Sequence, residues 1–174
     1  MCKIKLLTCS VPETLLFKLC ADCGFVSGFL LGANKGGVMK KTGRCYCGAL
    51  KYEVTKQAEA AFQCHCRECQ YITGGNPNIA MAFSKDAFRY IEGHPKKFAR
   101  GDLETPVTRH FCGDCGTAMG TESPARPNSM IVKVGTLDNP SDFSAQAAIF
   151  TCDIQPFHHL PDGLPAFEKR PPKK

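Results

Sequence analysis

The sequence predicts a mainly β domain organised around clustered cysteines. From Gly43 onward, short apolar runs of strand length are separated by Gly, Pro, Asn and Asp, the residues that favour turns. Helical periodicity is almost absent. Seven of the 12 cysteines fall into three tight clusters, and 174 residues with 43% hydrophobic composition suffice for one domain with its own core.

Residues 1–38 differ from the rest because their apolar pieces follow no sustained pattern. Residues 12–19 open with proline and are expected to form a short helix. Basic residues near the start resemble a secretory signal, but Lys18 and Asp22 are among the residues that interrupt the apolar stretch, so no signal peptide is expected. We expect 1–38 to be an extension, non-native through an upstream start codon or poorly ordered.

The first clear strand pattern is the alternating run LKYEV at residues 50–54. Further strands are expected, in chain order, at 60–63, 79–83, 88–91, 107–111, 130–134 and 147–151. The segment 161–174 carries four prolines and clustered basic residues, and it is expected to run extended over the surface and then fray. The predicted domain therefore spans 39–168, and residues 169–174 form a basic tail.

The formal charge of +6 can be traced to residues outside the expected core. Six positive charges lie outside the expected core, on Lys40, Lys41, Lys169, Arg170, Lys173 and Lys174. The folded part is thus nearly neutral, and the sequence predicts solvated ends rather than a nucleic-acid partner. No run approaches the roughly 20 apolar residues of a membrane span, so no membrane association is expected.

The first and third cysteine clusters are predicted to form the two halves of one metal site. Cys45 and Cys47 precede the alternating strand, whereas Cys112 and Cys115 follow a later one. Cysteines this close in sequence converge on a metal more readily than they form disulfides, which indicates a reducing, cytoplasmic environment. Four thiolates fill the tetrahedral shell of zinc, so a structural zinc is predicted here.

The central cluster places Cys64, Cys66 and Cys69 within six residues. Three protein ligands with one exchangeable position are typical of catalytic zinc. His65 is an alternative fourth ligand, but a side chain between two ligating cysteines tends to point away. The sequence therefore predicts two zinc ions per chain, of which the second is catalytic and less tightly held.

The alternative is that the clustered cysteines are buried small apolar side chains, but three such clusters are hard to explain this way. The other five cysteines carry weaker signals. Cys2 and Cys9 lack ligand spacing, and the pair Cys20 and Cys23 lacks a matching second pair. Cys152 stands alone and is read as a core or surface thiol.

Five motifs in order carry a resemblance to a known family: GRCYCGALKYEV, CHCRECQ followed by two glycines, RHFCGDCGTAM, VGTLDNP and PDGLPAFE. Over about residues 42–168 the chain resembles the glutathione-dependent formaldehyde-activating enzyme (GFA) and centromere-protein-V family. The resemblance implies a β-tent (Mss4-like) fold of small antiparallel sheets built around zinc sites. It also implies a structural zinc on the first and third clusters and a catalytic zinc on the central one.

The activity implied by the resemblance is condensation of glutathione with formaldehyde to S-hydroxymethylglutathione, the reverse of a carbon–sulfur lyase reaction. A soft thiol can bind zinc as thiolate at the open position. Because glutathione is anionic, cations near the central cluster are candidates for its recognition: Arg67, Arg100, Arg109 and Lys133. His110 is read either as a proton carrier or as a packed strand histidine.

The leading hypothesis is a zinc-dependent carbon–sulfur lyase-type enzyme, similar to S-(hydroxymethyl)glutathione synthase, that acts on a thiol and an aldehyde or their adduct. The alternative is a non-catalytic zinc-stabilised binding module of the centromere-protein-V type. Against the alternative, the chain has no long basic run and no aromatic residues interleaved with cations of the kind that single-strand binding needs.

Overall fold

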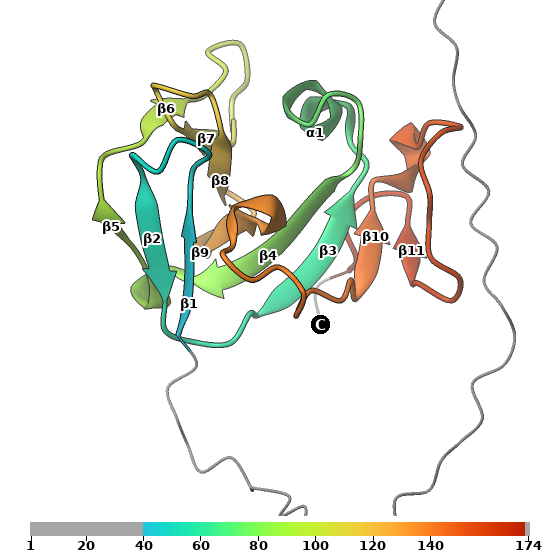
Figure 1. Ribbon diagram of the computed structural model, residues 1–174. Helices are drawn as coiled ribbons and strands as arrows, with labels where there is room; N and C mark the ends of the chain where they lie inside the picture. The colour runs from blue at the N-terminus through green and yellow to red at the C-terminus, as the bar shows by residue number, and fades with distance from the viewer. Residues whose placement is uncertain (1–39, 173–174) are drawn as a thin grey trace, which may run out of the picture. The chain divides into compact units, whose positions relative to one another are not determined.

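The computed structural model describes residues 40–172, which fold into eleven strands, one α-helix and three short 3-10 turns (Figure 1). The predicted helix at 12–19 lies outside the described residues, as do Cys2, Cys9, Cys20 and Cys23. Within the part of the chain that is described, no helix is long and apolar enough to cross a membrane.

A three-stranded antiparallel sheet has the order β1-β2-β5. Its strands are β1 (Lys41–Arg44), β2 (Lys51–Val54) and β5 (Phe88–Glu92). Gly43 in β1 lies against the Tyr52 ring, and a Cβ at this position would come within 2.3 Å of both the Tyr52 hydroxyl and the Thr136 carbonyl oxygen. Glycine is therefore required for Tyr52 to enter the core.

An eight-stranded sheet has the order β11-β10-β3-β4-β9-β8-β7-β6. Its strands are β3 (Ala60–Cys64), β4 (Asn78–Ser84), β6 (Lys96–Phe98), β7 (Thr108–Phe111), β8 (Ala118–Ser123), β9 (Arg126–Lys133), β10 (Ala147–Ile149) and β11 (Ala166–Phe167). All neighbours are antiparallel except that β10 runs parallel to both β3 and β11. The helix α1 (Arg67–Ile72) follows β3. The 3-10 turns are η1 (Lys85–Ala87), η2 (Val134–Thr136) and η3 (Thr151–Asp153).

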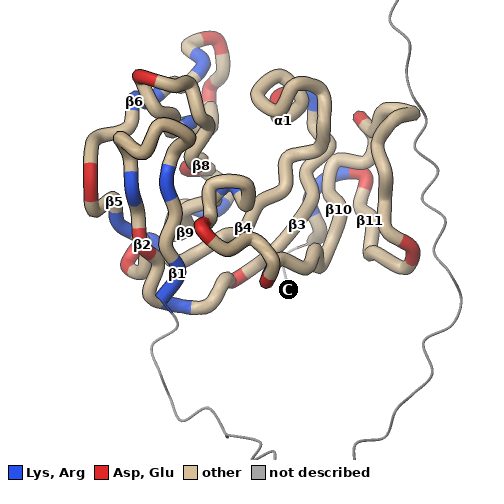
Figure 2. The backbone as a smooth tube through the Cα atoms, in the orientation of Figure 1, with Lys and Arg blue, Asp and Glu red and all other residues tan. Residues whose placement is uncertain are grey.

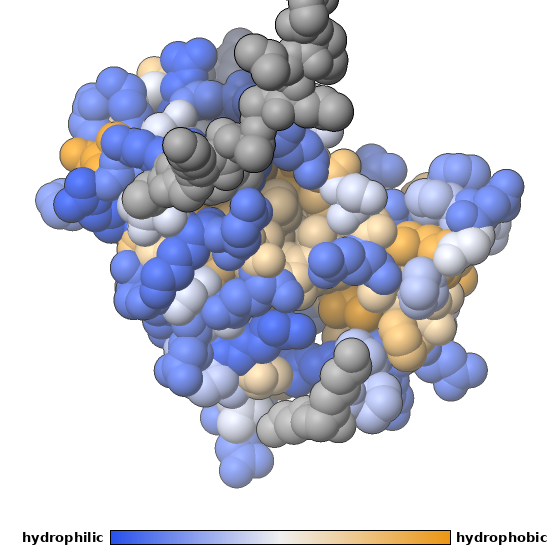
Figure 3. Space-filling view, turned by 90° about the horizontal axis from the view of Figure 1, so that it is seen from below, coloured by the Kyte–Doolittle hydropathy of each residue, from blue (hydrophilic) through white to orange (hydrophobic). Residues whose placement is uncertain are grey.

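The hydrophobic core lies between the two sheets. Phe83 and Val132 from the large sheet belong to the same buried cluster as Tyr52 and Val54 from the small one, and each is at most 1% exposed. Full burial of such side chains stabilises the fold by roughly 1.5–3 kcal/mol each. On the face drawn in Figure 3, hydrophilic side chains form most of the surface, and apolar ones gather toward the side of β10 and β11.

The predicted fold class, mainly β with small antiparallel sheets, is confirmed, and the arrangement is that of a β-tent. Each of the seven predicted strands coincides with an observed one. Not predicted were β1, β6, β8, β11 and α1, which are short or lack clean alternation. The tail expected to run extended instead pairs with β10 at Ala166–Phe167. The domain limits of 39 and 168 stay a prediction.

Candidate metal centres

The first centre unites the four cysteines of the first and third clusters. The sulfur atoms of Cys45, Cys47, Cys112 and Cys115 all lie within 4.8 Å of one another. The Sγ atoms are 3.5 Å apart between Cys45 and Cys47, and 3.8 Å apart between Cys47 and Cys112. A tetrahedral zinc ion with Zn–S bonds of about 2.3 Å needs sulfurs roughly 3.8 Å apart. The donor set and its spacing therefore fit zinc.

The four cysteines lie on two similar backbone turns. In the β1–β2 connection, the Leu50 amide donates to Cys45 Sγ at 3.2 Å, and Gly48 adopts a left-handed φ of 81°. In the β7–β8 connection, the Gly116 amide donates to the Cys112 carbonyl at 3.0 Å, and Gly116 has a φ of 72°. Glycine reaches this conformation without strain, which explains why each cluster ends in one.

Thr117 links the two turns of the first centre. Its hydroxyl lies 3.0 Å from Cys115 Sγ and accepts a hydrogen bond from the Tyr46 amide at 3.1 Å. This contact with Thr117 lowers the pKa of Cys115 to about 5, which favours the thiolate that a metal binds. Cys45 and Cys112 are both 1% exposed, whereas Cys47 is exposed. The site is closed in the sense that its four sulfurs supply every ligand of a tetrahedral zinc ion.

The second centre consists of Cys64, Cys66 and Cys69, whose sulfur atoms also lie within 4.8 Å of one another. Cys64 ends β3, Cys66 is the N-cap residue of α1, and Cys69 lies in its first turn. The Cys69 amide donates to the Cys66 carbonyl at 2.9 Å, which wraps the loop around one point. Among residues 40–172, no fourth side chain completes this group.

His65 does not join the three sulfurs. Its ring is fully buried, and its Nδ1 lies 3.0 Å from Nδ1 of His158. Its backbone carbonyl accepts a hydrogen bond from Gln70 Nε2, which also donates to the Asp153 carbonyl at 2.9 Å. The segment that carries η3 is thereby hydrogen-bonded to the central cluster through Gln70.

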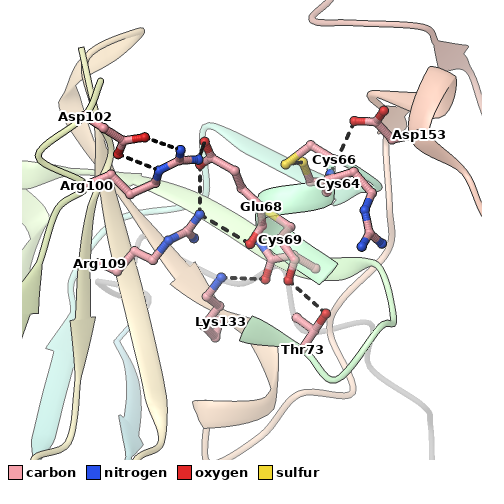
Figure 4. A network of polar contacts seen from close by, with 12 residues as sticks. Cys64, Cys66, Glu68, Cys69, Thr73, Arg100, Asp102, Arg109, Lys133 and Asp153 are labelled. Atoms are coloured by element: carbon pink, nitrogen blue, oxygen red, sulfur yellow. Dashed lines mark hydrogen bonds and ion pairs between the residues drawn. The ribbon is translucent and has the colours of Figure 1, made fainter. Parts of the chain in front are cut away.

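Cations surround the second centre, as Figure 4 shows. Arg109 Nη2 lies 3.1 Å from Glu68 Oε2 and 3.4 Å from the Glu68 carbonyl oxygen. Arg100 pairs with Asp102 and reaches Glu68 at 3.6 Å. Glu68 thereby ties α1 to β7 and to the connection between β6 and β7. Glu68, Arg100 and Arg109 line an open surface hollow together with Phe98, Leu103, Pro106 and Val107.

The two other predicted cations are Arg67, which begins α1, and Lys133, which ends β9. The Arg67 guanidinium donates to Gln70 and stands 5.5 Å from the centre of the Tyr71 ring. Lys133 is buried, and its Nζ donates to Asn78 Oδ1 at 2.7 Å. Burial lowers the pKa of Lys133 to about 8.

His110 is 5% exposed within β7 and lies apart from the three-sulfur loop, in a network of its own. Its Nε2 donates to Glu122 Oε1 at 2.8 Å, and Tyr90 lies 3.3 Å from its Nδ1. Burial lowers the pKa of His110, and the Glu122 carboxylate opposes that shift. These contacts are those of a packed strand histidine. Cys152 is an exposed thiol.

Several residues around the second centre were not singled out by sequence reasoning: Glu68, Gln70, Asn78, Asp153 and His158. Glu68 and Gln70 both lie within the CHCRECQ motif, so their position in that motif was the signal that could have identified them. Asn78 and His158 are brought to the loop by strand pairing and by the chain after β10. No local pattern marks them.

The chain is similar to several known proteins. Residues 40–153 match the family model described as "Glutathione-dependent formaldehyde-activating enzyme". A Halomonas elongata protein named "Putative glutathione-dependent formaldehyde-activating enzyme" is 30% identical over 91 residues, which are 49% of this chain and 57% of that protein. A Rhodobacter sphaeroides protein of known crystal structure is 20% identical, with a TM-score of 0.48 over 72% of this chain and 98% of the other.

Proposed function

The chain belongs to the glutathione-dependent formaldehyde-activating enzyme family, and on this premise we propose that it is a zinc-dependent enzyme of the carbon–sulfur lyase type. Its reaction is that of an S-(hydroxymethyl)glutathione synthase: a thiol such as glutathione adds to an aldehyde such as formaldehyde, or their adduct is cleaved. The observation that carries this proposal is the contrast between a closed four-sulfur centre and a three-sulfur centre lined with cations.

The two centres have different tasks in this proposal. Cys45, Cys47, Cys112 and Cys115 saturate one zinc ion, so that site is structural. Cys64, Cys66 and Cys69 leave one position for a substrate thiol. When bound there, zinc supplies the Lewis acidity that lowers the pKa of the thiol and holds its sulfur.

The chain's own residues bind and orient the rest of the thiol. Glutathione carries carboxylates and an ammonium group, and the hollow beside α1 offers both signs of charge. Arg109 and Arg100 can receive a carboxylate, whereas Glu68, whose side chain is 38% exposed, can receive the ammonium. These contacts convert a bimolecular encounter into a reaction between held groups.

A reducing, cytoplasmic location fits the same chemistry. All eight cysteines among residues 40–172 are free thiols, and seven of them belong to the two centres. Metal-binding thiolates survive where the surroundings keep them reduced.

The test uses ¹³C-formaldehyde and glutathione, whose spontaneous interconversion with the adduct can be followed by exchange NMR spectroscopy. Wild-type protein with two zinc ions should accelerate the exchange, and Cys66→Ser should abolish the acceleration while it keeps the circular dichroism spectrum. The control is Cys152→Ser, because Cys152 is exposed and belongs to neither centre. Full activity of Cys66→Ser would contradict the assignment of the second centre.

A different outcome would favour the non-catalytic zinc-stabilised binding module of the centromere-protein-V type. In that case the protein would hold one zinc ion and accelerate no thiol–aldehyde pair. Figure 2 shows Lys and Arg interspersed with Asp and Glu over the described strands rather than gathered on one stretch. This distribution does not provide the basic face that a polyanion-binding module needs.

A further inference from the structure

Lys133 is a buried ammonium group without a carboxylate partner among residues 40–172. The residue is 7% exposed, and Nζ makes one hydrogen bond there, to Asn78 Oδ1. None of the ion pairs in that part of the chain includes it. Burying an unpaired charge is unfavourable, so the position of Lys133 requires a compensating role.

The strand register aims Lys133 at the second centre. Cys64 in β3 stands opposite Asn78 in β4, and Ala80, two residues further along β4, stands opposite Lys133 in β9. Residues that face each other across a sheet, and residues two apart along a strand, project from the same face. Cys64, Asn78 and Lys133 therefore share one face of the eight-stranded sheet.

Two cations approach the second centre from the eight-stranded sheet (Figure 4). Arg109 and Lys133 both point from the sheet toward the loop that carries Cys69 (Figure 4). The two cations differ, because Arg109 forms an ion pair with Glu68, whereas Lys133 forms none among residues 40–172.

We propose that Lys133 is a catalytic residue that stabilises and protonates the aldehyde oxygen while the carbon–sulfur bond forms. The inference rests on the proposed function and adds to it the group that handles the oxygen. An ammonium has three N–H donors, of which Asn78 occupies one. The two others are free of partners in the described part of the chain, and a preorganised donor in a dry site is the usual means of stabilising an oxyanion.

The step balances without an oxidant or reductant. A sulfur electron pair forms the carbon–sulfur bond, and the π pair of the carbonyl moves to the oxygen. An N–H of Lys133 delivers its proton to that oxygen, which becomes the hydroxyl group of the adduct. The amine then takes one proton from solvent, equal to the proton that the thiol released on ionisation. In the reverse direction, the amine removes the hydroxyl proton as the carbon–sulfur bond breaks.

Lys133→Met tests the inference, because methionine retains the length of the side chain without the charge. Exchange NMR gives kcat and the KM for glutathione, and elemental analysis gives the zinc content. Binding of glutathione to the cobalt-substituted protein, read from its thiolate absorption bands, reports the ligand state without turnover. Lys51→Met is the matched control, since Lys51 is a half-exposed lysine on β2 that pairs with Glu92.

We expect Lys133→Met to keep two zinc ions and the cobalt–glutathione spectrum, with kcat reduced about 10²–10⁴-fold and KM unchanged. Lys133→Arg keeps the charge but cannot give up a proton readily, so it should restore zinc binding if that is impaired and leave kcat low. Lys51→Met should match the wild type in every measurement.

Three outcomes would overturn the inference. A raised KM with unchanged kcat would make Lys133 a carboxylate-binding residue. If Lys133→Met loses one zinc ion, but the fraction that still holds two zinc ions turns over at the wild-type rate, then Lys133 serves only to balance charge. Equal activity of wild type and Lys133→Met would remove any role. If the wild type itself accelerates no thiol–aldehyde pair, the proposed function fails and the inference falls with it.

Discussion

Nδ1 of His65 and Nδ1 of His158 lie 3.0 Å apart, and the surrounding contacts fix which ring donates. His158 Nε2 lies 2.7 Å from the Gly75 carbonyl oxygen, which can only accept, so Nε2 carries a proton. Nδ1 of His158 then accepts, both from the Gln155 amide and from His65. The loop that holds Cys64 and Cys66 is thereby fastened to the segment after β10.

His158→Phe should weaken the second metal centre selectively. Phenylalanine fills similar space but makes none of these hydrogen bonds, so the loop of Cys64 and Cys66 loses its attachment to the segment after β10. We expect about 10-fold weaker zinc binding at this centre, with the first centre unchanged. Competition with a chromophoric chelator measures both affinities. His159→Phe, at an exposed neighbouring position, is the control, and equal zinc affinity of the two variants would refute this role of His158.

The two centres should differ in their effect on folding. Cys112→Ser opens a closed site that joins the two β connections, and we expect it to lower the free energy of unfolding by at least about 3 kcal/mol. Cys66→Ser should cost less, because its centre binds residues within one loop. Urea unfolding of zinc-loaded proteins measures both. Equal losses would contradict the division into a structural and a catalytic centre.

Local spacing predicted much of this site. The three clusters named the same seven cysteines that the structure brings into two groups, because C-x-C and C-x2-C spacings act within a single turn. The hydrogen bond between Lys133 and Asn78 could not be predicted from the sequence, because it depends on the register of β3, β4 and β9. Short apolar runs located seven strands. The strand β6 has the sequence KKF, and all three of its residues are exposed, so it has no pattern of apolar residues that could predict it.

Gly43→Ala should destabilise the small sheet. The added Cβ would meet the Thr136 carbonyl and the Tyr52 hydroxyl at 2.3 Å, and both belong to packed elements that cannot move freely. We expect a loss of roughly 2–3 kcal/mol in the free energy of unfolding, measured in urea. Gly135→Ala is the control, because nothing lies within 4 Å of its Cβ position. Similar stability of the two variants would show that β1 can shift to make room.

Glu122 should make stability depend on acidification. It accepts hydrogen bonds from Lys85 at 2.7 Å, Lys97 at 3.1 Å and His110 at 2.8 Å, and the Lys85 contact contributes most to lowering its pKa from 4.5 to about 2. A folded-state pKa below the unfolded one stabilises the protein above pH 4.5, and this stabilisation disappears as the pH falls toward 2.

Glu122→Gln should therefore unfold more easily than wild type at pH 7, by about 1 kcal/mol after allowance for the 30% exposure of the carboxylate. The difference should shrink below pH 4.5 and vanish near pH 2. Metal loss on acidification affects both proteins alike, because the cysteine ligands are the same. Urea unfolding across this pH range provides the measurement, with the exposed Glu104→Gln as control. A difference that stays constant from pH 7 to pH 2 would mean that the charge of Glu122 contributes nothing, and that the substitution acts through packing alone.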